Sequence, residues 1–373
     1  MKEITLKFIG DIFPGDEIFT RGFGIKSKTT DANAELWIDD IKKTVGEADY
    51  IIGNLESPLI NDELATNPTF YGKPEFAKIL QKAGVNILNV ANNHILEHSE
   101  AGFKYTIKTL SENGQRVIGK YADGRSEVVM IEEHGTKICM AGFCDERVCH
   151  DNNNGNYYAP LRELWIFNAL DVMSDMGADI KIFIFHWGNE YINIPSPDQR
   201  TQAYKLIDAG ADLIIGHHPH VIQPYEKYKH GHIVYSLGNF CFDSISSKNF
   251  SVGMIADVIL NGNRIQKVKL RGVSLCDMIY TDHLTSAMTP SAFDDFYKAK
   301  SDYYYSLIPL SMDDYGRLYY RSHKSIHLRE RIRMKTKVLS DVFDIRNRYR
   351  KNHLYNINNY LRLLINKRNH GSN

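Results

Sequence analysis

The chain has 373 residues, of which 43% are hydrophobic and 24% are charged, and its formal net charge is zero. These values are typical of a soluble globular protein with one large or two ordinary domains. The zero balance hides an asymmetry, because residues 317–373 carry 15 Lys and Arg against 3 Asp and Glu. Such a split predicts a separate basic appendage with an anionic partner.

Cysteine usage argues against a disulfide-rich or zinc-ribbon protein, and hydropathy argues against a secreted or membrane-spanning one. The five cysteines are odd in number and contain no CxxC pair, which argues against a disulfide framework and a zinc ribbon, so we expect reduced thiols. Met1 to Glu3 lead directly into an alternating strand, which leaves no room for a secretory signal. No apolar run approaches the ~20 residues that span a bilayer. We therefore expect a cytoplasmic protein, with a peripheral position at the inner membrane face as an alternative.

Apolar runs alternate with helical patterns through the first two thirds of the chain. Strands are predicted at residues 4–9, 48–52, 85–90, 180–185, 211–215 and 233–240, and a hairpin at 128–131 with 137–142. Helices are predicted at residues 34–48, 75–83, 99–113, 161–176 and 198–209. Alternation of this kind predicts a layered α/β domain.

Polar side chains follow five of these strands directly. They are Asp11, Asn54 with Glu56, Asn93 with His94, His186, and His218 with His220. Open α/β sheets place their ligand crevices at the carboxyl ends of the strands. We therefore expect these side chains to meet at one rim of one sheet.

The densest group is the segment from Gly216 to His220, with three histidines in four positions after an apolar run. A single histidine at a strand end is usually a polar residue with an ordinary partner. Neutral imidazole is also the commonest metal ligand in proteins, and clustering favours that role here. The rings of His218 and His220 can converge on one point only if the backbone bends between them.

Seven blocks in the right order carry a resemblance to a known family. They are GDIFPGD (10–16), GNLESPL (53–59), ANNHILE (91–97), HWGNEY (186–191), PSPDQR (195–200), GHHPHVIQ (216–223) and YSLGNFCFD (235–243). The set resembles the CapA-type proteins of capsule and poly-gamma-glutamate synthesis, which look like a branch of the calcineurin-like metallophosphoesterases. The resemblance covers about residues 4–245.

The resemblance implies a fold, a division of the chain and a cofactor. The implied fold is a four-layer α/β/β/α metallophosphoesterase-like sandwich over residues 1–285, followed by a basic, mostly helical extension over 286–373. The implied cofactor is one or two divalent ions, Mn, Fe or Zn. Two such ions together bind the ester oxygens, generate hydroxide and stabilise the transition state.

The resemblance also implies roles for individual residues. One metal would be held by Asp11 and His220, the other by Asn93, His186 and His218, with Glu56 between them. His94 would protonate the leaving oxygen as a general acid. Apart from the resemblance, nearness in the sequence to these residues makes Asn54, Glu190, Tyr191, His217 and Gln223 candidates for contact with the substrate.

Two positions depart from the wider superfamily. Its first motif is Asp-x-His, whereas Phe13 stands at the third position here and cannot bind a metal. Its second motif supplies an aspartate where this chain has Asn54, which leaves Glu56 as the nearby charge. One metal position therefore has fewer ligands than in an ordinary phosphatase.

Simpler structural roles exist for several of these residues. Asp11 could be a helix N-cap, Glu56 could stabilise the turn at Ser57-Pro58, and His94 could brace Glu97. Asn93 could belong to a left-handed turn. Glu190, Tyr191 and Gln223 could pack or be solvated.

Three functions stay open from the sequence. The favoured one is a metal-dependent hydrolase or transferase that acts on a phosphoester or on a bond made during assembly of an anionic surface polymer. The second is a non-catalytic scaffold for the polymer or a synthase partner, and the third is a cytosolic metallophosphodiesterase. The basic helices at the C-terminus either pack on the core or contact an anionic membrane surface, polymer or synthase. No nucleic acid is expected, because no recognised motif accompanies the charge.

Overall fold

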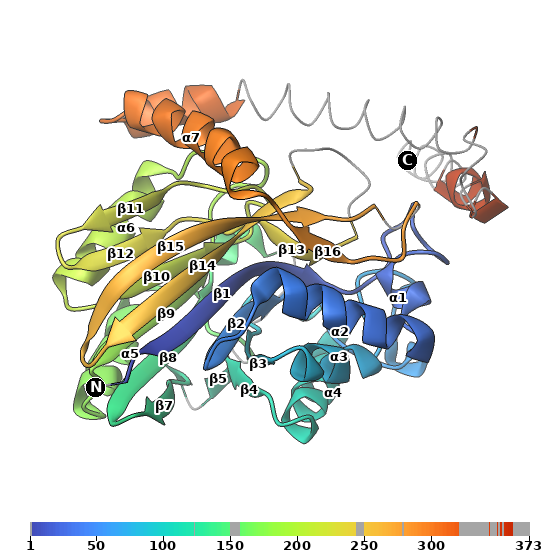
Figure 1. Ribbon diagram of the computed structural model, residues 1–373, viewed down its shortest axis with the longest axis horizontal. Helices are drawn as coiled ribbons and strands as arrows, with labels where there is room; N and C mark the ends of the chain where they lie inside the picture. Colours follow the sequence, from blue (N-terminus) through green and yellow to red (C-terminus); the bar gives the residue numbers. More distant parts are fainter. Residues whose placement is uncertain are drawn as a thin grey trace, which may run out of the picture.

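Two β-sheets face each other at the centre of the molecule, and helices lie against them (Figure 1). The structure is a computed structural model that describes residues 2–122, 124–149, 157–243, 250–277, 280–320, 343, 349, 351–352 and 354–360. The predicted α/β class is confirmed. The chain begins in the first sheet, enters the second at residue 129 and returns to the first after residue 238.

The first sheet is mixed and is centred on β1. Its strand order is β16 (Thr285–Ala287), β15 (Arg264–Leu275), β14 (Val252–Asn261), β1 (Ile4–Phe13), β2 (Tyr50–Leu55), β3 (Val85–Asn89) and β4 (Arg116–Ile118). Strands β1 to β4 run parallel, and β14 to β16 are antiparallel. The short β13 (Asn239–Phe242) pairs with the end of β1, where the register shifts between Asp11 and Ile12.

The second sheet contains the histidine-bearing strands. Its order is β11 (Tyr225–Tyr228), β12 (Gly231–Val234), β10 (Leu213–His217), β9 (Ile180–His186), β8 (Thr136–Cys144) and β7 (Val129–Glu133). The predicted hairpin is the antiparallel pair β7 and β8, and β8, β9, β10 and β12 run parallel. A separate small pair is formed by β5 (Tyr121–Ala122) and β6 (Arg125–Ser126).

Three buried clusters show how the layers pack. The central cluster joins the two sheets, with Leu6 and Phe8 of β1 packing with residues such as Ile182 of β9. A second cluster lies between the first sheet and α2 (Asp31–Val45), α3 (Glu75–Lys82) and α4 (Ser99–Glu112). The third lies between the second sheet and α5 (Glu163–Asp175) and α6 (Pro197–Asp208). Short helical turns occur at α1 (Ile25–Lys28), η1 (Asp62–Leu64) and η2 (Glu146–Val148).

The expectation that the polar strand ends lie in one sheet was wrong. Alternating strands and helices indicate parallel strands on each side of a crossover, but they do not say which strands share a sheet. Here the hairpin β7–β8 begins a second sheet, so that Asp11 and Asn54 belong to one sheet and His186 and His217 to the other. The polar strand ends therefore meet between two sheets.

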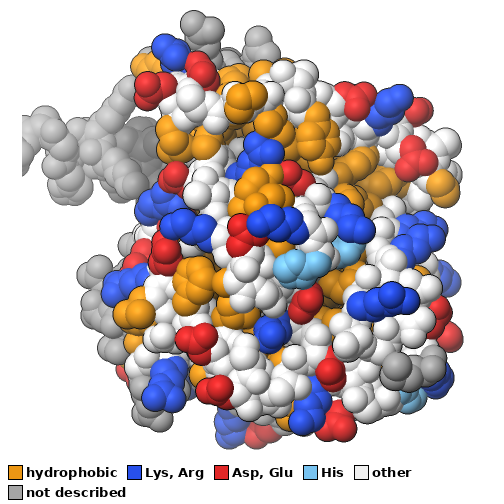
Figure 2. Space-filling model, turned by 90° about the vertical axis from the view of Figure 1, so that its left-hand side faces the viewer, with side chains coloured by type: hydrophobic (Ala, Val, Ile, Leu, Met, Phe, Trp, Pro, Cys, Tyr) orange, Lys and Arg blue, Asp and Glu red, His pale blue; other side chains and the backbone are white. Residues whose placement is uncertain are grey.

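The described residues beyond β16 pack on this core. In α7 (Pro290–Ser306), Phe293 is buried in the central cluster, with Phe296 and Tyr297 beside it. Figure 2 shows hydrophobic side chains gathered in the upper part of one face, at the level of α7. Further on, Tyr349 and Ile357 pack against Phe19 and Phe23. Most of the basic residues predicted for the helical extension lie outside the described residues.

None of the helices in the described segments is both long enough and apolar enough to cross a bilayer.

Gly216 offers a test of how closely β10 approaches its neighbours. A Cβ atom there would overlap the carbonyl oxygen of Tyr235, which already accepts a hydrogen bond from Trp187 Nε1 at 3.0 Å. We expect Gly216→Ala to lower the free energy of unfolding by about 1–3 kcal/mol, because the backbone at Tyr235 would have to shift to make room for the methyl group. Urea denaturation measures this loss.

Gly316→Ala is the matched control, since nothing lies within 4 Å of a Cβ at Gly316 and the residue is helical. It should leave stability unchanged or raise it by up to about 1 kcal/mol. Equal effects of the two substitutions would contradict the packing at Gly216.

Candidate metal centre

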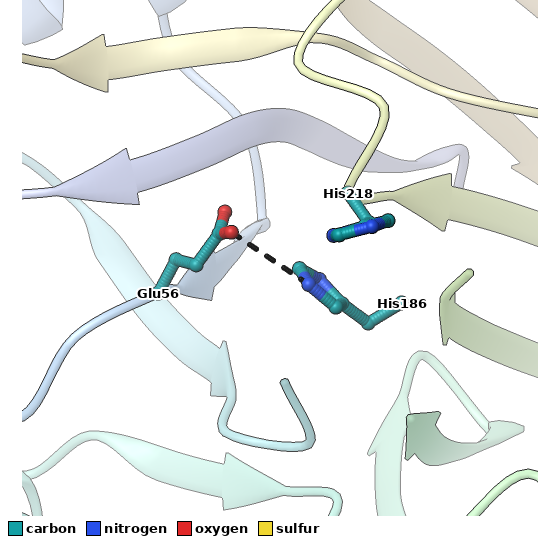
Figure 3. Close-up of side chains that lie close together, drawn as sticks. All are labelled: Glu56, His186 and His218. Atoms are coloured by element: carbon teal, nitrogen blue, oxygen red, sulfur yellow. Dashed lines mark ion pairs between the residues drawn. The ribbon is translucent and has the colours of Figure 1, made fainter. Parts of the chain in front are cut away.

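Carboxylates and imidazoles from both sheets converge at the ends of β1, β2, β9 and β10. Figure 3 shows Glu56 facing His186, with His218 beside it. All three side chains are buried. Asp11, at the end of β1, is brought to the same place, since one of its carboxylate oxygens is 3.6 Å from His220 Nδ1. The predicted meeting of residues 11, 186, 218 and 220 is therefore observed, although it takes place between two sheets.

Asp11 is a buried carboxylate with several donors. His217 Nδ1 and Asn54 Nδ2 each lie 2.9 Å from Oδ1, and the backbone N–H of His218 donates to Oδ2 at 3.3 Å. Burial acts to raise the pKa of Asp11, but the hydrogen bond and charge of His217 outweigh it, so this pKa is lowered. Asp11 is held as a carboxylate.

Glu56, in contrast to Asp11, accepts no hydrogen bond. Its side chain is fully buried, and neither carboxylate oxygen has a hydrogen-bond partner. His220 Nε2 and His186 Nε2 lie 3.5 and 3.6 Å from Oε1. Burial, and then the negative charge of Asp11, raise the pKa of Glu56 well above its ordinary value. A buried carboxylate without partners is costly, so this position calls for a cation or a proton.

Two imidazoles of the centre, His186 and His218, are disposed to stay neutral. Burial, followed by the charge of His218, lowers the pKa of His186 well below its ordinary value. Burial also lowers the pKa of His218 to about 4, although Glu190 opposes this. Neutral imidazole is the form that binds metals. His218 Nδ1 is itself buried and has no hydrogen-bond partner.

Three overlapping groups of side chains offer ligand atoms within 4.8 Å of one another. They are Glu56 with His186 and His218, Asp11 with Glu56 and His220, and Glu190 with His218 and His220. Glu56 joins the first two groups, so one carboxylate could serve both. Mixed oxygen and nitrogen donors of this kind suit Mn, Fe and Zn. The residues present therefore fit a divalent cation.

The backbone after β10 bends so that two histidines can face the centre. His218 has a φ of 94° and His220 a φ of 55°, and their ring centroids are 5.9 Å apart. Non-glycine residues with positive φ are uncommon and concentrate at functional sites. Tyr191 and Phe70, beside the same centre, also have positive φ, at 65° and 59°. The bend that the His-Pro-His spacing requires is present.

Several residues that the sequence did not assign orient the ligands. The Oδ1 atom of Asn239 lies 3.0 Å from His220 Nδ1. Asn89 and Asn92 donate to Asn54 Oδ1 at 2.9 and 3.3 Å. Asn54 is thereby fixed so that its own amide donates to Asp11. No local pattern identifies such partners, because each acts across strands.

Asn93 and His94 lie at the edge of the centre. Asn93 Oδ1 is 2.8 Å from His186 Nε2. His94 Nδ1 is 2.8 Å from Glu97 Oε1, and its ring stacks on Phe70 with centroids 4.8 Å apart. The bracing contact with Glu97 is therefore present. It involves Nδ1 of His94 and not Nε2.

The residues expected to contact substrate divide into two sets. Glu190 and Tyr191 are partly exposed, and the Tyr191 ring lies 6.1 Å from that of His220. His217 is buried against Asp11, and Gln223 is buried, where its Nε2 donates to the carbonyl of Ile192 at 2.8 Å. Asn54 is buried with Asp11. Only the first set faces open space.

A cavity of about 410 Å³ adjoins Tyr191. Residues 191–194 form one wall, and α7 with the segment 315–319 forms the other. Tyr303, Tyr315 and Tyr319 line it, together with Lys300, whose ammonium donates to Asn193 Oδ1 at 3.2 Å. Residues far along the chain therefore shape the surroundings of the centre.

Phe13 occupies an aromatic cluster. Its ring lies 4.9 Å from that of Phe242 and 5.4 Å from that of Phe70. Its side chain therefore packs against apolar rings and offers no metal ligand.

Comparison with known proteins places this geometry in context. The chain is 31% identical over 259 residues to the capsule biosynthesis protein CapA of Bacillus anthracis, with 65% of this chain and 60% of that protein covered. It is 30% identical over 257 residues to the PGA biosynthesis protein CapA of Bacillus subtilis, with 64% and 63% covered. The match thus spans less than two thirds of the length of either relative.

Among solved structures, the calcineurin-like phosphoesterase YfkN from Bacillus subtilis aligns with a TM-score of 0.45 and 12% identity, covering 80% of this chain and 96% of that one. The family model for the bacterial capsule synthesis protein PGA_cap matches residues 5–244, which include every candidate ligand at the strand ends described above. The chain therefore belongs to the bacterial capsule synthesis protein family.

Proposed function

We propose that this protein is a metal-dependent hydrolase or transferase that acts on a phosphoester or on a bond made during assembly of an anionic surface polymer. The observation that carries the proposal is the Glu56 carboxylate, which is fully buried, lacks a hydrogen-bond partner and lies 3.5–3.6 Å from two histidines. Such a group calls for a cation or a proton, and the two histidines beside it favour a cation.

The ligand set of the proposal follows the geometry of the centre. Asp11 and His220 would hold one divalent ion, and His186, His218 and Asn93 a second, with Glu56 shared. Glu190 is a further candidate near His218 and His220. Bound there, divalent cations would supply Lewis acidity and a lowered pKa for water.

Side chains of the protein would orient the Asp11 carboxylate and protonate the leaving oxygen. His217 and Asn54 hold the Asp11 carboxylate in one orientation. Glu97 holds His94 through Nδ1, which leaves Nε2 to deliver a proton to a leaving oxygen. Tyr191 and Glu190 would contact the substrate beside the cavity.

The substrate class is proposed from the relatives, whose names refer to capsule and PGA biosynthesis. An anionic polymer, its precursor or a synthase would be the partner. The 12-unit positive excess of residues 317–373 supports contact with such an acidic partner or an anionic membrane surface.

A non-catalytic scaffold is the second candidate, and Phe13 favours it. A phenylalanine at a position that carries a ligand in the wider superfamily removes one donor from the Asp11 side of the centre. A scaffold with a purely structural ion would tolerate that loss. Direct activity measurements separate the two.

Metal binding is the first test. Wild-type protein incubated with Mn²⁺ or Zn²⁺ and desalted should retain metal by elemental analysis. His218→Ala should weaken binding, measured by titration calorimetry, by more than the roughly 10–100-fold typical of a residue that only orients a ligand. His230→Gln, which changes a histidine bonded to the Ala211 carbonyl away from the centre, should bind as wild type does. Failure of the wild type to retain any metal would contradict the proposal.

Glu56→Gln should change stability in opposite directions with and without metal. In chelator, the substitution removes a buried carboxylate without partners, so the melting temperature should rise. With saturating Mn²⁺, the wild type should gain more than the variant, because ligand binding adds stability in proportion to affinity. Thermal melts under both conditions measure this. A lower melting temperature of the variant in chelator would mean that Glu56 has an ordinary structural partner.

Catalysis is tested with p-nitrophenyl and alkyl phosphate esters in the presence of Mn²⁺. His186→Ala should abolish turnover. His94→Gln should lower kcat by about 10²–10⁴-fold for alkyl esters, and by less for p-nitrophenyl esters, whose leaving group needs little protonation. A metal-loaded wild type that cleaves neither ester and no polymer precursor would favour the scaffold.

A further inference from the structure

Two thiols at the end of β8 lie almost in contact. Cys144 is the last residue of β8 and Cys149 follows η2, and their Sγ atoms are 3.2 Å apart. A disulfide bond is about 2.05 Å long, so the sulfurs need to approach by only about 1 Å. The cysteine count and the absence of CxxC had predicted reduced thiols, and they contain no information on this proximity.

The turn between the two cysteines is held by its own contacts. Asp145 caps η2 by accepting from the Arg147 backbone N–H at 3.0 Å, and the Arg147 side chain donates to the same carboxylate at 2.7 Å. The Asp145 carbonyl faces both thiols, with Cys149 Sγ at 3.4 Å and Cys144 Sγ at 3.7 Å. The turn therefore places the sulfurs together without any bond between them.

The two thiols differ in access. Cys144 is buried, whereas Cys149 is partly exposed and accepts a hydrogen bond from the Tyr158 hydroxyl at 2.8 Å. The thiolate is the reactive form of cysteine, and its access to solvent decides whether an oxidant can reach it. An accessible thiol next to a second, buried one is the usual arrangement of an oxidisable cysteine with its resolving partner.

We propose that Cys144 and Cys149 are a modification site that forms an intramolecular disulfide when the protein meets hydrogen peroxide. Peroxide transfers one oxygen to Cys149 Sγ, which becomes a sulfenic acid, and the first water leaves. Cys144 Sγ then attacks that sulfur, the S–S bond forms and the second water leaves. Two thiols and one peroxide thus give one disulfide and two waters.

The disulfide would lie one strand away from the candidate metal centre. Cys144 is the register partner of His186 on β9, and the Asp145 backbone N–H donates to the His186 carbonyl at 2.9 Å. The bond would lock the chain segment that supports His186. The proposal itself concerns thiol chemistry and does not depend on the proposed function.

The remaining thiols provide internal comparisons. Cys139 and Cys241 are buried, and Cys276 is partly exposed. Burial raises the pKa of Cys139 and of Cys276, which keeps these thiols protonated. Cys276 is partly exposed, as Cys149 is, and therefore serves as the control.

The experiment uses the full reduced chain, freed of reductant and treated with a small excess of hydrogen peroxide. Free thiols are then blocked with iodoacetamide in denaturant, and the protein is digested with trypsin without reduction. Cleavage after Arg147 separates the two cysteines, so the disulfide joins peptide 138–147 to peptide 148–162. We expect this linked pair by mass spectrometry, with Cys139 alkylated, and a fall in free thiols from five to three.

Two variants decide the assignment. Cys149→Ser should lose the linked peptides, and Cys276→Ser should retain them in wild-type yield. A disulfide that joins Cys149 to another cysteine or to a second chain would overturn the proposal. So would the recovery of Cys144 as an alkylated thiol beside an over-oxidised Cys149, because the partner would then have failed to resolve the sulfenic acid.

Discussion

The structure depends on the burial of two carboxylates between two sheets. Asp11 and Glu56 are both fully buried, yet their surroundings differ. Asp11 accepts hydrogen bonds from neighbouring donors, whereas neither oxygen of Glu56 has a hydrogen-bond partner. Burial and the nearby negative charge of Asp11 raise the pKa of Glu56, so this buried carboxyl group calls for a proton or a cation.

The two sheets also sustain local strain. His218, His220 and Tyr191 have positive φ angles around the same centre. Each such non-glycine residue costs on the order of 1–3 kcal/mol and persists only where the surrounding structure determines it. The strands before them, β9 and β10, are almost entirely buried and pair along their length. Buried strands followed by strained turns therefore hold these side chains in fixed positions.

The segment beyond the family match adds to this core. The family model ends at residue 244, but β14 and β15 complete the first sheet. Helix α7 and the tyrosines at 315 and 319 then build one wall of the cavity beside Tyr191. The strands that carry the candidate ligands and the cavity beside Tyr191 are therefore shaped by different parts of the chain.

The sequence by itself determined the α/β class, the positions of most strands and helices, and the residues that carry the candidate chemistry. Periodicity and strand-end position are local properties, and they sufficed for Asp11, Glu56, His186 and the histidines after β10. The resemblance added roles for them, which stay predictions until metal binding and turnover are measured.

Tertiary structure decided what depends on neighbours distant in the chain. It placed the strand ends in two facing sheets, because pairing is a non-local choice that alternation does not encode. It made His217 a partner of Asp11 and Asn239 a partner of His220, and it left both oxygens of Glu56 without a hydrogen bond. It also brought Cys144 against Cys149, although cysteine counting predicted no pair. Residue types can be read along a chain, but distances between side chains arise only when the backbone has folded.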